Sequence, residues 1–373
     1  MTITEDGSIN VNNSNAINVS QGATNVTINN AGNVNGGGNN GIKTDGTIDS
    51  IVNTGTISAK WNAIFATNGS TIKNLDNKGT IVGDVGIFLK DNGSKIETLN
   101  NSGNIISNGV TNGILLRDKS TIETLNNSGT ISAVGSNGIS IESNSTIENL
   151  NNSDTGFISS IKIAGNGTVN NINNQGTINY IRLDSNSKLG TLNNNGIISS
   201  DATGIHVNSG NVDLINNKNI IKGDANGILV QRYNNDSANV KTIENTGTIL
   251  GVNEVGLLVI THNGKIDLID NKQTGLIQGG IDAIRLFASF GKIGKIEQVN
   301  NEGSIIGGQN GINIQEFSNN KGLVNYINTI TNKGTILGQS GAGIYVNGAN
   351  QHIKDYIKLE GSNALIAGGT AGI

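Results

Sequence analysis

Apolar residues along this chain of 373 residues recur in short groups separated by turn-forming residues. Within the groups, Ile, Val and Leu stand at alternating positions, while Asn, Ser and Gly fill the intervals. An alternation with a period of two is typical of β-strands, and none of the groups is long enough to predict a helix. The pattern therefore predicts an all-β protein with many short strands.

The short strands belong to a repeat of the form Asn-x-Gly-x-Ile, as in VNTGTI, DNKGTI and NNEGSI. Thirteen copies follow one another at intervals of 20 to 31 residues, and one copy has Asn219 in place of the glycine. Two residues after the glycine position, every copy has a β-branched residue: Val34, Ile57, Ile81, Ile105, Ile131, Ile158, Ile178, Ile198, Ile221, Ile249, Ile277, Ile305 and Ile336. Before the glycine position, every copy has an asparagine: Asn30, Asn53, Asn77, Asn101, Asn127, Asn152, Asn174, Asn194, Asn217, Asn245, Asn271, Asn301 and Asn332.

A repeat of this size cannot bury its apolar face alone, so successive copies must stack on one another. Each copy holds three strand-like pieces, Ile-x-x-Leu, Gly-Thr-Ile and Gly-Ile-x-Leu. We predict a parallel β-helix, or β-solenoid, with three strands per coil and about 14 coils. The unequal coil lengths favour the right-handed form. We expect one solenoid over 1–373, with an N-terminal coil or cap at 1–30 and repeats at 31–373.

The constant positions of the repeat have a physical explanation in such a solenoid. The β-branched column fills the narrow core, and the asparagines from Asn53 to Asn332 form a ladder of hydrogen-bonded amides, as stacked identical Asn residues do in cross-β assemblies. The glycine is expected to give the backbone freedom for the corner. Proline is absent from the chain, because a missing N–H would interrupt a ladder in a central strand.

Composition excludes several classes of protein. The chain has no cysteine, a net charge of −4 and only 14% charged residues, so disulfide scaffolds, thiol enzymes and nucleic-acid binders are not expected. No stretch is apolar enough to insert in a membrane as a helix. His206, His262 and His352 lie in separate copies, and HExxH, GxSxG and GxxxxGK[ST] motifs are missing. We therefore expect no catalytic site, no metal and no cofactor.

The middle position of the Gly-Ile-x-Leu strand is expected to face outward. Most of its residues are apolar or basic: Lys43, Phe65, Phe88, Leu115, Ser140, Lys162, Arg182, His206, Leu229, Leu258, Arg285, Asn313 and Tyr345. We predict that a contact strip for a partner consists of Trp61, Phe65, Phe88, Leu115, Arg182, His206, Leu229, Leu258, Arg285 and Tyr345. A corner loop that covers the column, or stacking that only stabilises the sheet, is the alternative interpretation.

The outward column of the Ile-x-x-Leu strand is polar and mostly acidic. It includes Glu97, Glu123 and Glu148 in three successive copies. A cation site would explain stacked carboxylates, since like charges directly opposite each other are unfavourable. A solvated face with screened repulsion is the simpler explanation, and we favour it.

The phrase Leu-Asn-Asn-Ser-Gly-Thr-Ile, with close variants that start at Leu99, Leu125 and Leu150, resembles the passenger repeats of type V autotransporters. The Asn- and Ile-rich form is similar to those of Campylobacter and related bacteria. The resemblance covers nearly the whole chain, and it implies a β-helical adhesin passenger at the Gram-negative cell surface. It also implies a signal peptide and an outer-membrane β-barrel, which this chain does not contain, so we expect the chain to be a fragment.

We therefore predict a non-catalytic passenger for adhesion, autoaggregation or biofilm formation. Its expected partner is a host-cell surface protein or glycan, or another passenger. A structural stalk that presents a distal domain is one alternative. A polysaccharide lyase or hydrolase is another, with Asp184 beside Arg182 or Asp282 beside Arg285 as its candidate residues. Long corners at 231–240, 288–295 and 315–326 are further candidates for function.

Overall fold

The computed structural model describes residues 1–231, 238–261, 264–288, 294–316, 324–348 and 350–373. In this part of the chain all regular secondary structure is β-strand, and no helix is long and apolar enough to cross a membrane. The described residues form two compact units, Met1–Ile178 and Asn179–Ile373, here called unit 1 and unit 2. Most of each long corner predicted at 231–240, 288–295 and 315–326 lies outside the described residues.

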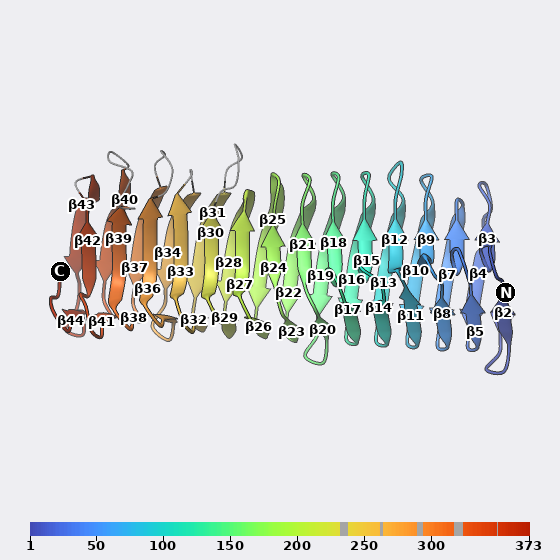
Figure 1. The fold of residues 1–373 in the computed structure, drawn as a ribbon, viewed down its shortest axis with the longest axis horizontal. Helices are drawn as coiled ribbons and strands as arrows, with labels where there is room; N and C mark the ends of the chain where they lie inside the picture. Colours follow the sequence, from blue (N-terminus) through green and yellow to red (C-terminus); the bar gives the residue numbers. More distant parts are fainter. Residues whose placement is uncertain (232–237, 262–263, 289–293, 317–323, 349) are drawn as a thin grey trace. The chain divides into compact units, whose positions relative to one another are not determined.

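Unit 1 contains three parallel sheets, and each coil contributes one strand to each sheet (Figure 1). Sheet A comprises β1 (Thr2–Ile3), β4 (Val26–Asn30), β7 (Thr47–Asn53), β10 (Thr71–Asn77), β13 (Lys95–Asn101), β16 (Thr121–Asn127), β19 (Thr146–Asn152) and β22 (Thr168–Asn174). Sheet B comprises β2 (Ser8–Asn10), β5 (Asn33–Asn35), β8 (Thr56–Ser58), β11 (Thr80–Gly83), β14 (Asn104–Ser107), β17 (Thr130–Ala133), β20 (Phe157–Ile158) and β23 (Thr177–Ile178). Sheet C comprises β3 (Ile17–Val19), β6 (Ile42–Thr44), β9 (Asn62–Ala66), β12 (Val85–Leu89), β15 (Ile114–Leu116), β18 (Ile139–Ile141) and β21 (Ile161–Ile163).

Unit 2 repeats the same three-sheet arrangement. Its sheet A comprises β25 (Ser187–Asn194), β28 (Gly210–Asn217), β31 (Ala238–Asn245), β34 (Gly264–Asn271), β37 (Gly294–Asn301), β40 (Asn325–Asn332) and β43 (Gln351–Leu359). Its sheet B comprises β26 (Ile197–Ser200), β29 (Ile220–Gly223), β32 (Thr248–Gly251), β35 (Leu276–Gly279), β38 (Ser304–Gly307), β41 (Thr335–Gly338) and β44 (Leu365–Gly368). Its sheet C comprises β24 (Ile181–Leu183), β27 (Thr203–Asn208), β30 (Asn226–Gln231), β33 (Val255–Thr261), β36 (Asp282–Ala288), β39 (Asn310–Glu316) and β42 (Ile344–Asn347).

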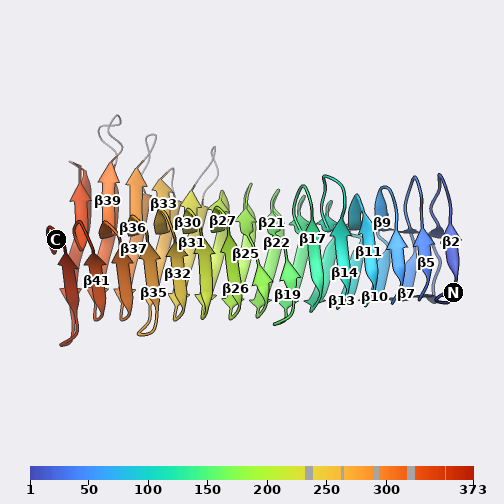
Figure 2. The same cartoon turned by 60° about the horizontal axis from the view of Figure 1, so that its bottom comes forward.

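This arrangement confirms the predicted fold class, an all-β parallel solenoid with three strands per coil. The Ile-x-x-Leu, Gly-Thr-Ile and Gly-Ile-x-Leu pieces are the strands of sheets A, B and C, respectively. Figure 2 shows β5, β11 and β14 of sheet B in unit 1 from a second side. In this sheet the β-branched column is in register, so that Ile81 pairs with Ile57 and Ile105, and all three are fully buried.

The asparagine column forms a hydrogen-bonded ladder inside each unit. From Asn30 to Asn174 in unit 1, each side-chain Nδ2 donates to the Oδ1 of the next asparagine at 2.7–2.8 Å. From Asn194 to Asn332 in unit 2 the same bonds measure 2.7–2.8 Å. These side chains are at most 1% exposed. Each buried amide inside the ladder therefore has partners in the neighbouring coils, whereas Asn30 Oδ1 at the start of the ladder has none among the described residues.

The repeat glycine has a different role from the one expected. A Cβ atom on Gly79 would lie 2.0 Å from the carbonyl oxygen of Gly55 in the preceding coil, and its φ is not positive. Positive φ values occur instead at other turn residues, such as Asn68 and Gly69. Glycine is therefore favoured at this position because stacked corners leave little room for a side chain, although one copy accommodates Asn219. Backbone freedom was the wrong explanation.

Candidate functional site

The residues of the predicted outward column lie in one column of sheet C in each unit. In unit 1 the pairing runs from Lys43 through Phe65 and Phe88 to Leu115. In unit 2 six successive pairings connect the residues of the column: Arg182, His206, Leu229, Leu258, Arg285, Asn313 and Tyr345. Residues of similar position but different chemistry therefore stand side by side on one face of each unit.

The aromatic part of this column lies in unit 1. The rings of Phe65 and Phe88 stack with their centroids 5.3 Å apart and an interplanar angle of 28°. Both side chains are half-buried, whereas Leu115 in the next strand is only 4% exposed. Leu115 was predicted to face solvent, but its neighbours cover it. The exposed apolar surface of this aromatic part is therefore limited to the two half-buried phenyl rings.

A second apolar feature borders the column at the corner between sheets B and C. Trp61, Val110 and Val134 occupy this corner in unit 1 and are 56%, 81% and 83% exposed. The corners of successive coils lie close together, since a Cβ atom on Gly135 would be 3.2 Å from the Cα of Val110. We call Trp61, Val110 and Val134 the corner ridge; Trp61 lies two coils from Val110, and the corner of the coil between them carries Asp84. Of these three residues, the sequence-based prediction included only Trp61. Val110 and Val134 could also have been found, because each is an apolar residue in a corner made mostly of Asn, Ser and Gly.

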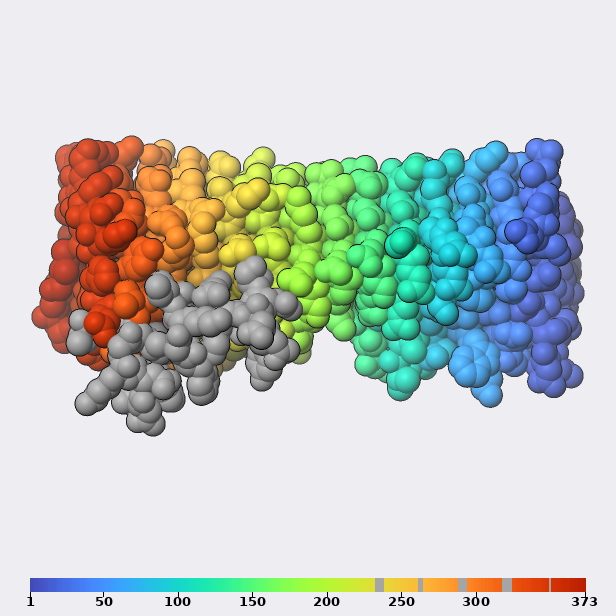
Figure 3. Space-filling view, turned by 90° about the horizontal axis from the view of Figure 1, so that it is seen from above, coloured from blue at the N-terminus to red at the C-terminus, as the bar shows by residue number. Residues whose placement is uncertain are grey.

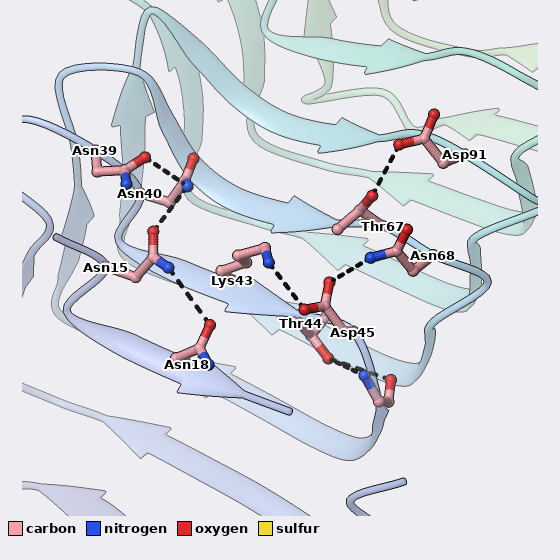
Figure 4. Close-up of polar contacts among 11 residues, drawn as sticks. Asn15, Asn18, Asn39, Asn40, Lys43, Thr44, Asp45, Thr67, Asn68 and Asp91 are labelled. Atoms are coloured by element: carbon pink, nitrogen blue, oxygen red, sulfur yellow. Dashed lines mark hydrogen bonds and ion pairs between the residues drawn. The ribbon is translucent and has the colours of Figure 1, made fainter. Parts of the chain in front are cut away.

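One of the two basic residues of the column in unit 1, Lys43, is part of a polar network (Figure 4). Lys43 Nζ lies 2.8 Å from Asp45 Oδ2, and the other carboxylate oxygen accepts a hydrogen bond from Asn68 Nδ2 at 3.2 Å. In the next coil Thr67 Oγ1 donates to Asp91 Oδ2 at 3.1 Å. The positive charge of Lys43 is therefore neutralised by Asp45, which lies in the turn that leads from sheet C to sheet A.

In unit 2 the column begins with an ion pair. Arg182 Nε donates to Asp184 Oδ2 at 2.7 Å, and Asn208 Nδ2 donates to the other oxygen of Asp184 at 2.6 Å. Asp184 was one of the two carboxylates considered for a lyase or hydrolase. Both of its oxygens accept hydrogen bonds from this chain, which hold the carboxylate in place.

His206 lies next to Arg182 in this column. Gln231 Nε2 lies 2.7 Å from the ring Nε2 of His206, and the hydroxyl of Tyr180 lies 3.4 Å from its Nδ1. Burial lowers the pKa of His206 to about 4, and the positive charge of Arg182 acts in the same direction. The imidazole is therefore neutral at physiological pH and accepts a hydrogen bond from Gln231.

The two leucines of the column in unit 2 form a buried cluster. Leu229 and Leu258 are 8% and 9% exposed, and Ile260 and Phe287 pack against them. The prediction that both leucines face solvent is wrong, because side chains from neighbouring positions of sheet C cover them. At this place the alternative interpretation, cross-strand stacking that stabilises the sheet, describes the structure better.

The column ends with Arg285, Asn313 and Tyr345. Arg285 Nε lies 2.5 Å from Asp282 Oδ2, and Asp282 is fully buried. Asp282 was the other carboxylate considered for catalysis, but burial keeps it away from a substrate. Tyr345 is 40% exposed. These residues border a polar pocket.

The acidic column of sheet A is neutralised by lysines. Lys95 Nζ in unit 1 lies 3.3 Å from Glu97 and 2.7 Å from Glu123, and its pKa is raised by the hydrogen bond to Glu123. Glu148 accepts a hydrogen bond from Asn170. Among the described residues no group of three or more His, Asp or Glu side chains is placed to hold a metal ion. The structure thus gives no support to a cation site at these glutamates.

Comparisons with protein-family models, with curated proteins and with solved structures found no significant match to this chain. The fold and the surface therefore define its class. It is a parallel β-solenoid repeat protein, compatible with a structural or adhesin-like role, that carries an apolar ridge on unit 1 and a polar pocket on unit 2.

Proposed function

We propose that this chain is part of a non-catalytic adhesin at the surface of a bacterial cell, and that it binds host or neighbouring cells through the outer surface of its solenoid. The corner ridge is the observation that carries the proposal. Its three side chains are all more than half exposed and follow one corner of unit 1. The resemblance of the repeats to autotransporter passengers supports the extracellular location.

The chemistry of the ridge favours contact with another macromolecule. Exposed apolar groups bordered by polar residues are typical of interaction sites, and Trp is enriched among the residues that dominate binding energies. Sheet C adds the half-buried rings of Phe65 and Phe88 beside the ridge. Ordinary turn residues would serve a purely structural corner as well, and the exposure of Trp61, Val110 and Val134 at the same corner therefore supports a contact role.

The test is a triple variant, Trp61→Ser, Val110→Ser and Val134→Ser. Because the three side chains are exposed, each change should alter the free energy of unfolding by only about 0.5 kcal/mol. Beads coated with the purified protein should lose most of their adhesion to epithelial cells and to one another. Bead adhesion is counted by microscopy, and self-association is followed by sedimentation velocity.

The matched control changes three exposed residues at the corner between sheets A and B of unit 1: Thr54→Ala, Lys78→Ala and Ser102→Ala. This control should adhere as the unchanged protein does. Equal adhesion by the ridge variant and the unchanged protein would contradict the proposal.

A structural stalk is the second candidate. The uniform stacking of coils and the continuous amide ladder within each unit favour it, because these features stabilise a solenoid whatever its surface binds. A stalk predicts that both triple variants leave adhesion unchanged and that a domain beyond this chain carries it. The same experiment therefore separates the two candidates.

A further inference from the structure

A polar pocket of about 390 Å³ lies on the outer surface of unit 2. Three adjacent strands of sheet C, β36, β39 and β42, contribute Arg285, Asn313 and Tyr345 (Figure 1). The preceding corners contribute the exposed side chains of Gln309 and Ser340. A volume of this size falls within the range of small-molecule sites. The pocket lies in another unit than the corner ridge and is built from other residues.

The buried carboxylate of Asp282 holds the base of the pocket in place. Its Oδ1 accepts hydrogen bonds from the backbone N and the Nδ2 of Asn310 at 3.2 and 2.9 Å. Its Oδ2 accepts from Asn313 Nδ2 at 2.8 Å and from Arg285 Nε at 2.5 Å. Asn310 in turn accepts a hydrogen bond from the backbone N of Ala342 at 3.0 Å. Arg285 and Asn313 are thus fixed before any ligand arrives, which lowers the cost of binding.

The groups around the pocket match a ligand rich in hydroxyls. Gln309 and Ser340, together with Asn347, offer amide and hydroxyl groups that can both donate and accept hydrogen bonds. The ring of Tyr345 is 40% exposed and provides a flat apolar surface with a hydroxyl at one end. Few apolar side chains line the pocket, so an aliphatic or lipid ligand would fit poorly.

Arg285, which is paired with Asp282, is the group in the pocket that can donate hydrogen bonds to an anionic ligand. Arg285 is the only charged residue among the described residues that line it, and its side chain remains 20% exposed. The ion pair to Asp282 engages Nε, and a guanidinium offers further N–H donors on its Nη atoms for a carboxylate. Asp282 itself is fully buried beneath Arg285 and presents no oxygen at the surface.

We propose that this pocket binds an acidic saccharide, with the carboxylate of the sugar on the Nη atoms of Arg285 and a sugar ring against Tyr345. Gln309, Ser340 and Asn347 then contact the sugar hydroxyls. This assignment adds a glycan site on unit 2 and holds whether or not the corner ridge mediates adhesion.

Isothermal titration of the full chain with two matched pairs of sugars tests this assignment. The pairs are cellobiouronic acid with cellobiose, and 3′-sialyllactose with lactose, because the members of each pair differ mainly by the acidic group or residue. At least one acidic sugar should bind at millimolar concentration or below, and its neutral partner should bind about tenfold more weakly. The change Arg285→Gln should remove this preference.

A second variant is needed because Arg285→Gln also takes a donor from the buried Asp282. The change Tyr345→Ala affects an exposed ring and should weaken binding of the acidic sugar by roughly five- to tenfold while the protein stays folded. Tyr356→Ala is the matched control, since Tyr356 is 49% exposed on sheet A and does not line the pocket. This control should bind as the unchanged protein does.

Three results would overturn the assignment. One is the absence of binding by both acidic sugars at millimolar concentration. Another is the loss of specific carboxylate recognition, seen either as equal binding of the acidic and neutral members of each pair or as displacement of the acidic sugar by the same concentration of sodium sulfate; displacement would indicate a general anion site. The third is unchanged binding by the Tyr345→Ala variant. The corner-ridge variant should bind the sugar normally, so failure of one proposal can be distinguished from failure of the other.

Discussion

The inner asparagine ladder and the outer column of sheet C are built from the same repeats but differ in how they vary. At the ladder position every copy from Asn30 to Asn332 has the same residue. At the column position the copies range from Phe65 and Phe88 to Arg182 and Tyr345. Both sets of residues are stacked in register between successive coils. Register alone therefore does not require identical residues.

Burial and hydrogen bonding explain the difference. A ladder asparagine has no access to water, so its amide must find partners in the coils on either side, and only another asparagine offers a donor and an acceptor at the same height. A residue of the outer column needs only to avoid a steric clash or like-charge repulsion with the residue opposite it on the adjacent strand. Side chains that differ from one coil to the next can therefore stand on the outer face with little loss of stability.

The largest expected effect is at the ladder. Asn101 Nδ2 donates to Asn127 Oδ1 at 2.8 Å, to Gly103 O at 3.2 Å and to Thr130 O at 3.2 Å, and its Oδ1 accepts from Asn77. The change Asn101→Ala leaves several buried groups without partners and opens a cavity. We expect a loss of about 4 kcal/mol in the free energy of unfolding. Urea denaturation measures the loss, and hydrogen exchange should locate it in β13 and β16.

Asn100→Ala is the matched control, since Asn100 precedes Asn101 on the same strand. Its half-buried amide lies on the outer side of sheet A and accepts one hydrogen bond, from Asn126 at 2.9 Å. This change should cost about 1 kcal/mol or less. Similar losses in the free energy of unfolding for the two variants would show that the buried ladder position contributes no more to stability than the outer position.

The second effect concerns His206 and pH. Its folded-state pKa of about 4 lies below its unfolded value of about 6.5, so the unfolded chain takes up the proton first as the pH falls. The free energy of unfolding should therefore decrease from about pH 6.5 to pH 4, by up to roughly 3 kcal/mol, and should not depend on His206 above about pH 7. Urea denaturation across this range measures the profile.

The variant His206→Gln isolates this contribution, because the other titrating groups remain in both proteins. The difference in stability between the two proteins should change between pH 6.5 and pH 4 and be constant above pH 7. If the two profiles run parallel through the whole range, His206 is as easily protonated in the folded protein as in the unfolded chain, and its burial does not lower its pKa.

The smallest effect is expected from the stacked rings of the outer column. A double-mutant cycle with Phe65→Ala and Phe88→Ala should give a coupling energy of about 1 kcal/mol, because the rings stack with centroids 5.3 Å apart. The same cycle with Phe65→Ala and Phe157→Ala is the control, since Phe157 lies on sheet B in another coil, and its effects should add. Additive effects in the first cycle would indicate that stacking of the two rings does not contribute to stability.

Much of the fold could be predicted from the sequence because the information is repeated. The register of Ile57, Ile81 and Ile105 in sheet B and the ladder partners of Asn101 follow from a repeat that buries one face and stacks on itself. The predicted column of sheet C was also in the correct register. The role of the repeat glycine was missed, because a sequence does not show how closely the corners of two coils approach.

The exposure of individual column residues could not be predicted in this way. Alternation indicates which side of a strand a residue faces, but it does not indicate what covers that side. Leu115 and Leu258 face outward and are nevertheless buried, whereas Val110 and Val134 lie in corners that the repeat does not constrain. Coil length and corner conformation vary from copy to copy, so these contacts depend on neighbours that are distant in sequence.

Figure 3 shows the coils of unit 1 as successive bands in space-filling form, and this regularity reflects what the sequence by itself determined. The repeat determines three parallel sheets, a core of β-branched side chains and an amide ladder, because each coil is held by copies of itself. Only the tertiary structure decided which outer residues remain accessible. It buried Asp282 beneath Arg285, covered Leu229 with neighbouring side chains and exposed Trp61, because these outcomes depend on close packing between different coils.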